Sequence, residues 1–419
     1  MKLRQRIKRI NCKKVVAAGF LLAIFYIGSA TLPSTAKSIA GFFKGEQNGI
    51  LALAANIDDQ YRNMLGFSDY NLRNKGFYIN LNGLMARTMG QRYMNERIKL
   101  DNGHLTYLGG KRDTTLAAVQ LKKLHDKQAE NGKSFLFVLA PYQIPKYEVI
   151  IPAGYEDYRN QNADNLLVVL KEEGIPVLDL REEMYIDGIG HSEAFFVTDH
   201  HWKPETGFWA YMKIIQTLEN ATMIDPIDSF YTDITEYNIE VYDEFCLGSH
   251  GKRTGRYYAG IDDIEIITPG FDSDISISIP SKELNIRGEL SETAFNWDRL
   301  EKDFFSANPY ATYNHGRSDL KEYRNESAPA DLKVLTIGDS FALVPFTFLP
   351  LVFSACNQLD MRLFEGDFLE YYSGFDPDII IVLVNPSQVA GDNTTYDFFN
   401  DYGENEDMAK QGDDDADER

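Results

Sequence analysis

Apolar and polar positions alternate between helix-like and strand-like patterns in the first half of the chain. Over 115–128 the apolar side chains fall roughly on one helical face, and 134–140 form a nearly continuous apolar run that stops at Pro141. Residues 163–173 and 177–180 repeat this pattern. A helix followed by a short apolar strand is typical of a parallel sheet with helices on its faces. The pattern therefore predicts an α/β fold.

In the second half of the chain, the alternation of helix-like and strand-like segments is interrupted and then resumes. Residues 225–330 contain short β-like pieces between Gly, Pro and Asp turns, and we interpret them as a β-rich insertion that shapes a substrate cleft. Pro204 suits the first turn of the helix before this insertion. The elements predicted in this half are a helix over 203–219, strands at 264–268, 275–279, 333–337, 361–364 and 378–384, and a helix from near Pro345 to Cys356.

The first 32 residues carry an export signal. Seven lysines and arginines and no acidic residue occur in the first fourteen positions, and an uncharged run of 18 residues follows from Val15 to Leu32. A basic segment before an apolar one is a secretory signal. Small residues at 28–30 suit a signal peptidase, and the run is also near the lower limit for spanning a membrane. Cleavage and retention as a membrane anchor both stay open, and residues 33–100 are expected to form a helical neck.

The charge of the chain excludes one class of partner. The formal net charge is −21 at pH 7, which disfavours contact with phosphate backbones, so nucleic acid is not an expected partner. Part of the acidity lies in the tail at 396–419, which is predicted to be disordered and without chemistry. Outside the export signal the only cysteines are Cys246 and Cys356, and the sequence leaves open whether they pair. No CxxC pair suggests a metal site.

Asp199 and His201 form the first candidate for chemistry, just before the helix predicted over 203–219. An aspartate two residues before a histidine in an extended loop can orient the imidazole and hold the tautomer that accepts a proton. We therefore expect His201 to be a general base and Asp199 its orienter. Two alternatives stay open: a capped turn with structural histidines, and a metal site formed with His191 and His200.

Ser340 is the second candidate, within Gly338-Asp339-Ser340-Phe341. This tetrapeptide follows an apolar strand and precedes a helix, which is where an α/β fold exposes a side chain to a ligand. The free N–H groups of a helix start favour developing negative charge. Ser340 is thus placed as a nucleophile whose own N–H could help to form an oxyanion hole. The alternative is an ordinary helix-capping serine.

The order of these motifs resembles a known superfamily. The serine motif after an apolar strand, and a later apolar strand that ends in Asn385, are similar to the first and third sequence blocks of the SGNH (GDSL-like) hydrolases. The resemblance implies a three-layer α/β fold with a mostly parallel sheet. It also implies an oxyanion-hole role for Asn385 and, from its order alone, for Gly366. Pro386 follows Asn385 where the superfamily usually has Asp.

The Asp and His of that superfamily follow the serine, whereas here they precede it. This circularly permuted order resembles the DHHW family of exported bacterial proteins and the alginate O-acetylation proteins AlgX and AlgJ. The resemblance covers about residues 101–395 and rests on Gly103–Tyr107, Ala140 and Pro141 with Lys146, Val177–Leu180, Thr198–Trp202, and Gly338–Phe341 followed by Pro345 and Phe346. It implies that Ser340, His201 and Asp199 act as a catalytic set without a metal or other cofactor.

What the resemblance implies for function is an exported serine O-acetyltransferase or acetylesterase that acts on a cell-envelope or extracellular polysaccharide. The implied partners are an exopolysaccharide or cell-wall glycan and a membrane-bound O-acyltransferase as acetyl donor. No carbohydrate-binding module is recognisable after the sheet, so the polymer is not indicated. The alternative is a non-catalytic glycan-binding or scaffold protein of a polysaccharide assembly.

Two further segments attract attention. Residues 247–255 are rich in Gly and basic side chains, but without a Walker lysine after a strand we interpret them as a turn beside the cleft. The aromatic run from Tyr310 to Tyr313, followed by Asn314 and His315, suits either stacking on a sugar ring or packing in the core.

Overall fold

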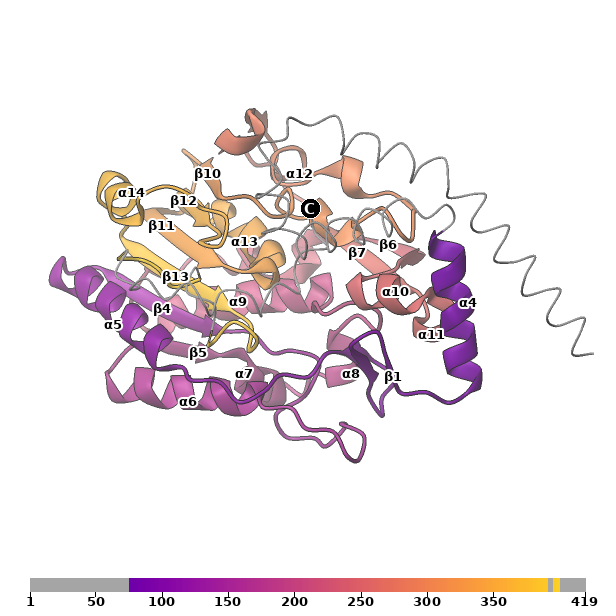
Figure 1. The fold of residues 1–419 in the computed structure, drawn as a ribbon. Helices are drawn as coiled ribbons and strands as arrows, with labels where there is room; N and C mark the ends of the chain where they lie inside the picture. The colour runs from indigo at the N-terminus through magenta and orange to yellow at the C-terminus, as the bar shows by residue number, and fades with distance from the viewer. Residues whose placement is uncertain (1–74, 391–394, 400–419) are drawn as a thin grey trace, which may run out of the picture. The chain divides into compact units, whose positions relative to one another are not determined.

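The computed structural model describes residues 75–390 and 395–399. The predicted export signal, residues 33–74 of the predicted neck and residues 400–419 of the predicted tail lie outside these residues. Within the described part of the predicted helical neck, 75–88 is a helix, but 93–94 and 97–99 are strands, so a helix throughout the neck is wrong. No helix among the described residues has the length and apolar character needed to cross a membrane. The chain divides into two compact units between Ile79 and Asn80. The second unit contains the sheet and the candidate site (Figure 1).

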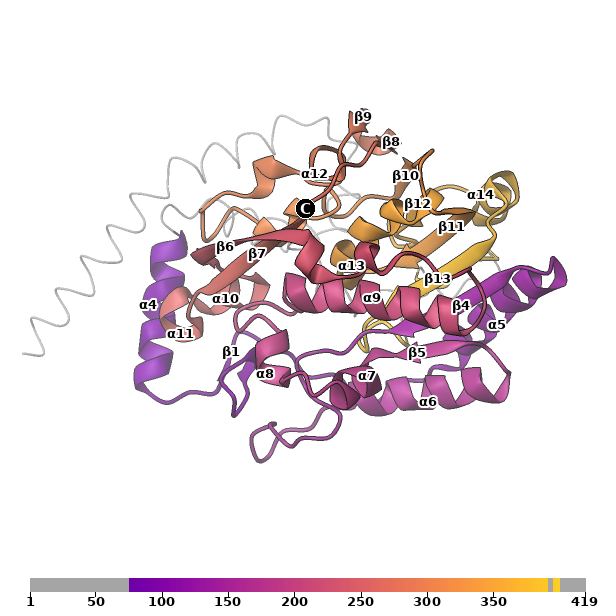
Figure 2. The ribbon, with the colours of Figure 1, turned by 180° about the vertical axis from the view of Figure 1, so that it is seen from behind.

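Figures 1 and 2 show how the helices and strands of the described chain are arranged. The strands are β1 (Tyr93–Met94), β2 (Arg97–Lys99), β3 (Leu105–Thr106), β4 (Ser134–Leu139), β5 (Val177–Asp179), β6 (Tyr237–Cys246), β7 (Asp262–Pro269), β8 (Ile275–Ile279), β9 (Leu284–Gly288), β10 (Leu320–Arg324), β11 (Ala330–Gly338), β12 (Phe353–Leu359) and β13 (Ile379–Val384). The helices are α4 (Lys75–Thr88), α5 (Thr115–Glu130), α6 (Arg159–Glu172), α7 (Leu180–Ile186), α8 (His191–Ala194), α9 (Pro204–Asn220), α10 (Ser249–Thr254), α11 (Arg256–Ala259), α12 (Leu290–Thr293), α13 (Leu343–Phe348) and α14 (Phe368–Phe375).

One sheet of eight strands organises the second unit, in the order β5-β4-β13-β11-β12-β10-β8-β9. The first five strands of this order pair in parallel. The strands β10, β8 and β9 extend the sheet in antiparallel pairs. Separately, β6 and β7 form a two-stranded sheet and β1–β3 a three-stranded one. The predicted α/β fold with a mostly parallel sheet is confirmed.

Helices cover both faces of the sheet because its central strands are apolar on both sides. Alternate residues of β13 enter two different cores: Ile379 and Ile381 pack with side chains of α9 and α13, whereas Ile380 and Val382 pack with side chains of α5, α6 and α14. The successive side chains of a strand point to opposite faces, so this strand joins the two cores. Figures 1 and 2 show α5 and α9 on opposite sides of the sheet.

Most of the predicted helices and strands are present within one to four residues of their predicted ends. Residues 225–330 are β-rich as expected, and the pieces predicted at 264–268 and 275–279 are β7 and β8. β8, β9 and β10 continue the main sheet beyond β12, whereas β6 and β7 stand apart from it.

The helix predicted from Pro345 to Cys356 is wrong in its second half. Helix α13 ends at Phe348, and Phe353–Leu359 is strand β12, which lies between β11 and β10. Two polar side chains of β12 interrupt its apolar pattern, so the hydrophobicity of the sequence does not indicate a strand there. Both are buried and hydrogen-bonded: Asn357 Oδ1 accepts from Arg324 at 2.6 Å, and Gln358 Nε2 donates to the carbonyl oxygen of Phe346 at 2.8 Å.

The strand predicted at 361–364 is also wrong, because these residues form a turn. The carboxylate of Asp360 accepts from the backbone N–H of Arg362 at 3.1 Å. The carbonyl oxygen of Asp360 accepts from the N–H groups of Leu363 and Phe364 at 2.9 and 3.0 Å. An aspartate that binds the backbone ahead of it favours a turn over a strand. Gly366 therefore follows a turn after β12, not a strand at 361–364.

Candidate active site

Ser340, His201 and Asp199 form a continuous hydrogen-bonded chain although they lie far apart in sequence. The Oγ atom of Ser340 is 2.7 Å from Nε2 of His201, and Nδ1 of His201 is 2.6 Å from Oδ1 of Asp199. An ionised carboxylate can only accept hydrogen bonds, so Nδ1 carries the imidazole proton and Nε2 accepts from the serine hydroxyl. This is the geometry of a nucleophile, a general base and its orienting acid.

The loop that carries Asp199 and His201 is held in place from within and from β7. Oδ1 of Asp199 accepts from the backbone N–H of His201 at 3.0 Å, which closes a local turn. Thr198 donates its backbone N–H and its hydroxyl to Oδ2 of Asp262 in β7, at 2.8 and 2.6 Å. Helix α9 then begins at Pro204. The carboxylate of Asp262, distant in sequence, thus fixes the loop immediately before Asp199 and His201.

Ser340 begins a single 3₁₀ turn at the end of β11. Asp339 caps this turn, because its Oδ1 accepts from the N–H of Phe341 at 2.8 Å. Oδ2 of Asp339 accepts two further bonds from Asn385, from the backbone N–H at 2.8 Å and from Nδ2 at 2.7 Å. A Cβ atom at Gly338 would lie 2.6 Å from Cβ of Ala342, so the turn requires glycine there. Asn385 therefore reaches the serine turn through Asp339.

The carboxylate of Asp199 is buried and ionised. Burial raises its pKa, but the adjacent imidazoles of His200 and His201 and the backbone N–H of Ser249 outweigh burial and hold the pKa well below the usual range. The N–H of Ser249, at the start of α10, donates to Oδ2 of Asp199 at 2.6 Å. A Cβ atom at Gly248 would lie 2.2 Å from Cβ of Asp199, so only glycine allows this approach.

Two aromatic rings enclose the imidazole of His201. The ring of Tyr310 stacks on it with centroids 4.2 Å apart and planes 16° apart, and the ring of His200 lies 3.8 Å away. Tyr310 and Tyr313 are both buried. Of the two interpretations of this aromatic run, packing in the core holds in the structure, since neither ring is exposed to stack on a sugar.

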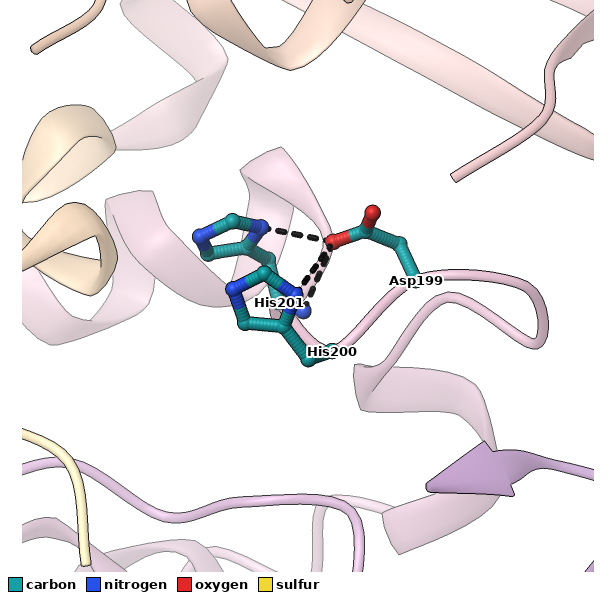
Figure 3. A group of neighbouring side chains, drawn as sticks. All are labelled: Asp199, His200 and His201. Atoms are coloured by element: carbon teal, nitrogen blue, oxygen red, sulfur yellow. Dashed lines mark hydrogen bonds and ion pairs between the residues drawn. The ribbon is translucent and has the colours of Figure 1, made fainter. Parts of the chain in front are cut away.

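His200 is part of the same cluster. Figure 3 shows the imidazoles of His200 and His201 turned toward one carboxylate oxygen of Asp199. Nδ1 of His200 is 3.6 Å from that oxygen and 2.9 Å from the hydroxyl of Ser249. These three side chains offer ligand atoms within 4.8 Å of one another, which is close enough to hold a metal ion. His191 is not in this group, and its Nε2 lies 2.7 Å from the carbonyl oxygen of Tyr142.

Gly366, the two cysteines and the glycine-rich segment 247–255 are the other positions that the sequence singled out. Gly366 is exposed, and a Cβ atom on it would contact the ring of Phe364 at 2.7 Å. An oxyanion role for Gly366 stays a prediction. Cys246 and Cys356 are buried and free, so the disulfide left open by the sequence is not present. The glycine-rich segment 247–255 lies beside the catalytic cluster, since it contains Gly248 and Ser249.

Several residues of the site escaped sequence reasoning. Two of them are Asp262 and Gln143, whose Nε2 donates to the backbone oxygens of Phe196, at 3.2 Å, and of Asp199. Their contacts with the loop span more than fifty positions, so no local pattern indicates them. Asp339 had a signal, because an aspartate directly before a helical turn is a favoured cap.

Comparisons with known proteins agree with this arrangement. Residues 106–231 match the family model described as "SGNH hydrolase-like domain, acetyltransferase AlgX". The match includes Asp199 and His201 and ends before Ser340. It confirms the resemblance to AlgX-type SGNH-like domains over that part of the chain. Among curated proteins no sequence matches the chain.

Solved structures extend the likeness to most of the chain. PatB1 of Bacillus cereus, solved with a sulfonyl adduct, is 17% identical with a TM-score of 0.61, over 73% of this chain and 98% of PatB1. A second structure of PatB1 has a TM-score of 0.59. A DHHW family protein from Eubacterium siraeum DSM 15702 is 15% identical with a TM-score of 0.55, over 73% of this chain and 95% of that protein. At these identities the likeness shows a shared fold.

Proposed function

We propose that the chain is an exported SGNH-like serine O-acetyltransferase or acetylesterase of a cell-envelope or extracellular polysaccharide. The observation that carries the proposal is the chain of short hydrogen bonds from Ser340 through His201 to Asp199. A serine hydroxyl in this arrangement is activated by its neighbouring base, and such general-base catalysis contributes about 10²–10⁴-fold to a rate. The name of the matched family, which includes an acetyltransferase, supports acetyl as the transferred group.

The proposed reaction has two steps. Ser340 Oγ attacks the acetyl carbonyl carbon, its proton passes to Nε2 of His201, and the bond to the leaving oxygen breaks as His201 returns the proton to that oxygen. A sugar hydroxyl or water then attacks the carbonyl carbon of the acetyl-serine and loses its proton to Nε2 of His201. The bond between the acetyl group and Oγ of Ser340 breaks as His201 returns this proton to Oγ. Asp199 stabilises the imidazolium that forms in each step. The sugar acceptor makes the enzyme a transferase, and water makes it an esterase.

The negative charge on the carbonyl oxygen requires hydrogen-bond donors. Asn385 Nδ2 is one candidate, because one of its N–H groups bonds to Asp339 and an amide carries two. Oδ1 of Asn385 accepts from Ser387 N–H at 2.8 Å, which agrees with this orientation of the amide. Backbone N–H groups near Ser340 and Gly366 are the other donors that we propose.

Export and partners belong to the same proposal. Residues 1–32 would direct the domain out of the cytoplasm, with residues 15–32 either cleaved or kept as an anchor. An anchored domain would stay close to a membrane-bound O-acyltransferase, which we propose as the acetyl donor, and to the glycan that accepts the group. A transferase is the version of the proposal that this proximity favours.

Covalent labelling of Ser340 tests the nucleophile. We expect a sulfonyl fluoride to modify Ser340 of the native protein, because a sulfonyl group traps an activated serine and PatB1 has been solved with such an adduct. His201→Ala should slow labelling by about 10²-fold or more, since it removes the base. Peptide mass spectrometry locates the adduct, and circular dichroism checks that each variant is folded.

The control for this experiment is Ser354→Ala in β12, because the hydroxyl of this serine donates to the carbonyl oxygen of Leu332 at 3.2 Å and has no part in the proposed site. This variant should still be labelled at Ser340. A folded native protein that carries no adduct on Ser340, or equal labelling of native protein and His201→Ala, would contradict the proposal.

A non-catalytic glycan-binding protein is the second candidate, favoured by the burial of the site. The exposed fraction of Ser340 is only 3%, and that of His201 is 1%. A binding protein that has lost turnover would bind saccharide as a Ser340→Ala variant and would leave the native serine unlabelled. A metal site at Asp199, His200 and His201 is tested by an assay of ester hydrolysis. With such a site, a chelator would abolish the hydrolysis and zinc would restore it.

A further inference from the structure

A second polar pocket lies beside the serine turn, and we call it the Lys321 pocket. Its lining includes Gly338 at the end of β11, Asp339 directly after it, Asp360 after β12, and Arg317 and Lys321 around the start of β10. The pocket is small and partly open to solvent. No step of the reaction described above uses its two basic side chains.

Strand direction explains why this pocket lies at the same edge of the sheet as the nucleophile. β11 and β12 are parallel and pair Ile337 with Leu359, so their carboxyl ends lie side by side. β10 runs antiparallel to β12 and pairs Leu320 with Leu359, so the first residues of β10 reach that same edge. Neighbouring strands are about 4.8 Å apart, which places β10 roughly 10 Å from β11. One substrate can span that distance from Ser340.

Lys321 is the unusual residue of the pocket. Its exposed fraction is 5%, and no side chain of the described residues forms a hydrogen bond or ion pair with its ammonium group. Asp360, a carboxylate of the lining, is already engaged: Arg362 Nε lies 2.9 Å from its Oδ1, and Arg317 Nε lies 3.2 Å from its Oδ2. The ammonium group of Lys321 therefore has no anionic partner among the described residues, although its side chain is almost wholly buried, and it borders the open space of the pocket.

Lys321 and the charged groups that act on it together hold one more positive than negative charge. They are the cations Lys321, Lys282 and Arg317 and the carboxylates Asp319 and Asp360. Nζ of Lys282 donates to the carbonyl oxygens of His315 and Arg317 at 2.8 and 3.0 Å. Burial lowers the pKa of Lys321 to about 7. An incoming anion would supply the partner that the ammonium lacks.

We infer that the Lys321 pocket binds a small oxyanion, a carboxylate or a phosphate, carried by a molecule that reacts at Ser340. The inference rests on the proposed function, since it assigns the pocket to the substrate or donor of that reaction. Lys321 Nζ supplies the charge and hydrogen bonds, and Arg317 adds a second positive group at the pocket wall. Charge-assisted hydrogen bonds of this kind are among the strongest that a protein offers to an anion.

Anion binding can be measured without turnover in the full-length Ser340→Ala protein. We would titrate it by calorimetry with glucuronate, with glycerol 3-phosphate and with uncharged glucose, at about pH 6, where Lys321 is mostly protonated. We expect one of the two anions to bind at least about tenfold more tightly than glucose. The tighter anion identifies the group as a carboxylate or a phosphate.

Lys321→Met in the same background removes the charge and keeps the length of the side chain. It should weaken binding of that anion by at least about tenfold, whereas Lys302→Met, a change at an exposed lysine outside the pocket, should leave it unchanged. The inference is overturned if neither anion binds better than glucose, or if Lys321→Met binds the anion as tightly as its parent. The first of these results needs no variant of Lys321, so it stands even if Lys321→Met does not fold.

The two proposals fail in different ways. If neither anion binds better than glucose but the sulfonyl fluoride labels Ser340 normally, the anion site is refuted and the proposed serine enzyme is supported. Anion binding that depends on Lys321, together with an unreactive Ser340, would keep the pocket as a ligand site and would favour the non-catalytic binding protein.

Discussion

Asp199 and His191 differ in charge state because their partners differ. Asp199 is ionised, since the imidazoles of His200 and His201 and the N–H of Ser249 outweigh burial. His191 is neutral, because burial lowers its pKa to about 4 and its bond to a backbone carbonyl only partly offsets this. The neighbouring charged and hydrogen-bonding groups thus decide whether an ionisable side chain removed from water keeps its charge.

The pKa of His191 predicts a pH-dependent contribution to stability. Between about pH 6.5 and pH 4 the unfolded chain takes up a proton at His191 that the folded chain does not, so this contribution falls as the pH decreases. From pH 7 to about pH 5 we expect the free energy of unfolding to fall by about 2 kcal/mol more in the native protein than in His191→Gln. Urea unfolding at both pH values measures the difference. Identical pH dependence of the two proteins would show that His191 is not held neutral.

At the scale of elements, two helices begin next to the residues of the candidate site. α9 begins three residues after His201, and α13 begins three residues after Ser340. They pack closely at Gly207, where a Cβ atom would lie 2.6 Å from Cβ and Cγ1 of Val344. The distance between these helices therefore controls the distance between the base and the nucleophile.

Gly207→Ala should weaken the site by separating the two helices. Overpacking typically costs about 1–3 kcal/mol, and a displacement of the reacting groups by about 1 Å can lower a rate by about 10²-fold. We expect sulfonyl labelling of Ser340 to slow by at least about tenfold. Gly374→Ala is the matched control, because Gly374 also lies in a helix and a Cβ atom there contacts nothing within 4 Å. Equal labelling rates in the two variants would show that the contact between the two helices does not affect the reactivity of Ser340.

At the scale of the whole molecule, we propose from the charge and the first residues that the protein works outside the cytoplasm. The net charge of −21 contrasts with the basic segment at the start of the chain. This contrast is typical of an exported protein, since the basic flank stays in the cytoplasm and the remainder crosses the membrane. The proposed acetylation of an external glycan depends on this export.

A fusion of residues 1–32 to alkaline phosphatase tests export in a bacterial host. We expect an active phosphatase, because that enzyme gains activity only outside the cytoplasm, and the segment has the basic and apolar regions of a signal. Replacing Leu21 and Leu22 by Asp should abolish the activity, since charge in the apolar region blocks insertion. An inactive fusion of the unchanged segment would refute export by these residues. Whether the fusion is recovered in soluble or membrane fractions distinguishes cleavage from anchoring.

The local pattern of the sequence was sufficient for much of the fold and for the identity of the catalytic candidates. Runs such as 134–140 and 378–384 indicated buried strands because they are apolar without interruption. Asp199, His201 and Ser340 were identifiable because each lies where an element begins or ends. The same reasoning failed at β12, where Asn357 and Gln358 satisfy their polar groups inside the sheet. A buried hydrogen bond has no signature in a hydrophobicity pattern.

Only the tertiary structure decided how these candidates meet. It joined Ser340 to His201 across 139 positions, stacked Tyr310 on the imidazole, and placed Lys321 at the sheet edge that holds the nucleophile. These relations depend on the order and direction of strands and on close helix packing at Gly207. Local sequence determines which segments become helices or strands, because periodicity and turn chemistry act over a few residues. The contacts of a site form between segments that are distant in the chain, so they are decided by how those segments pack.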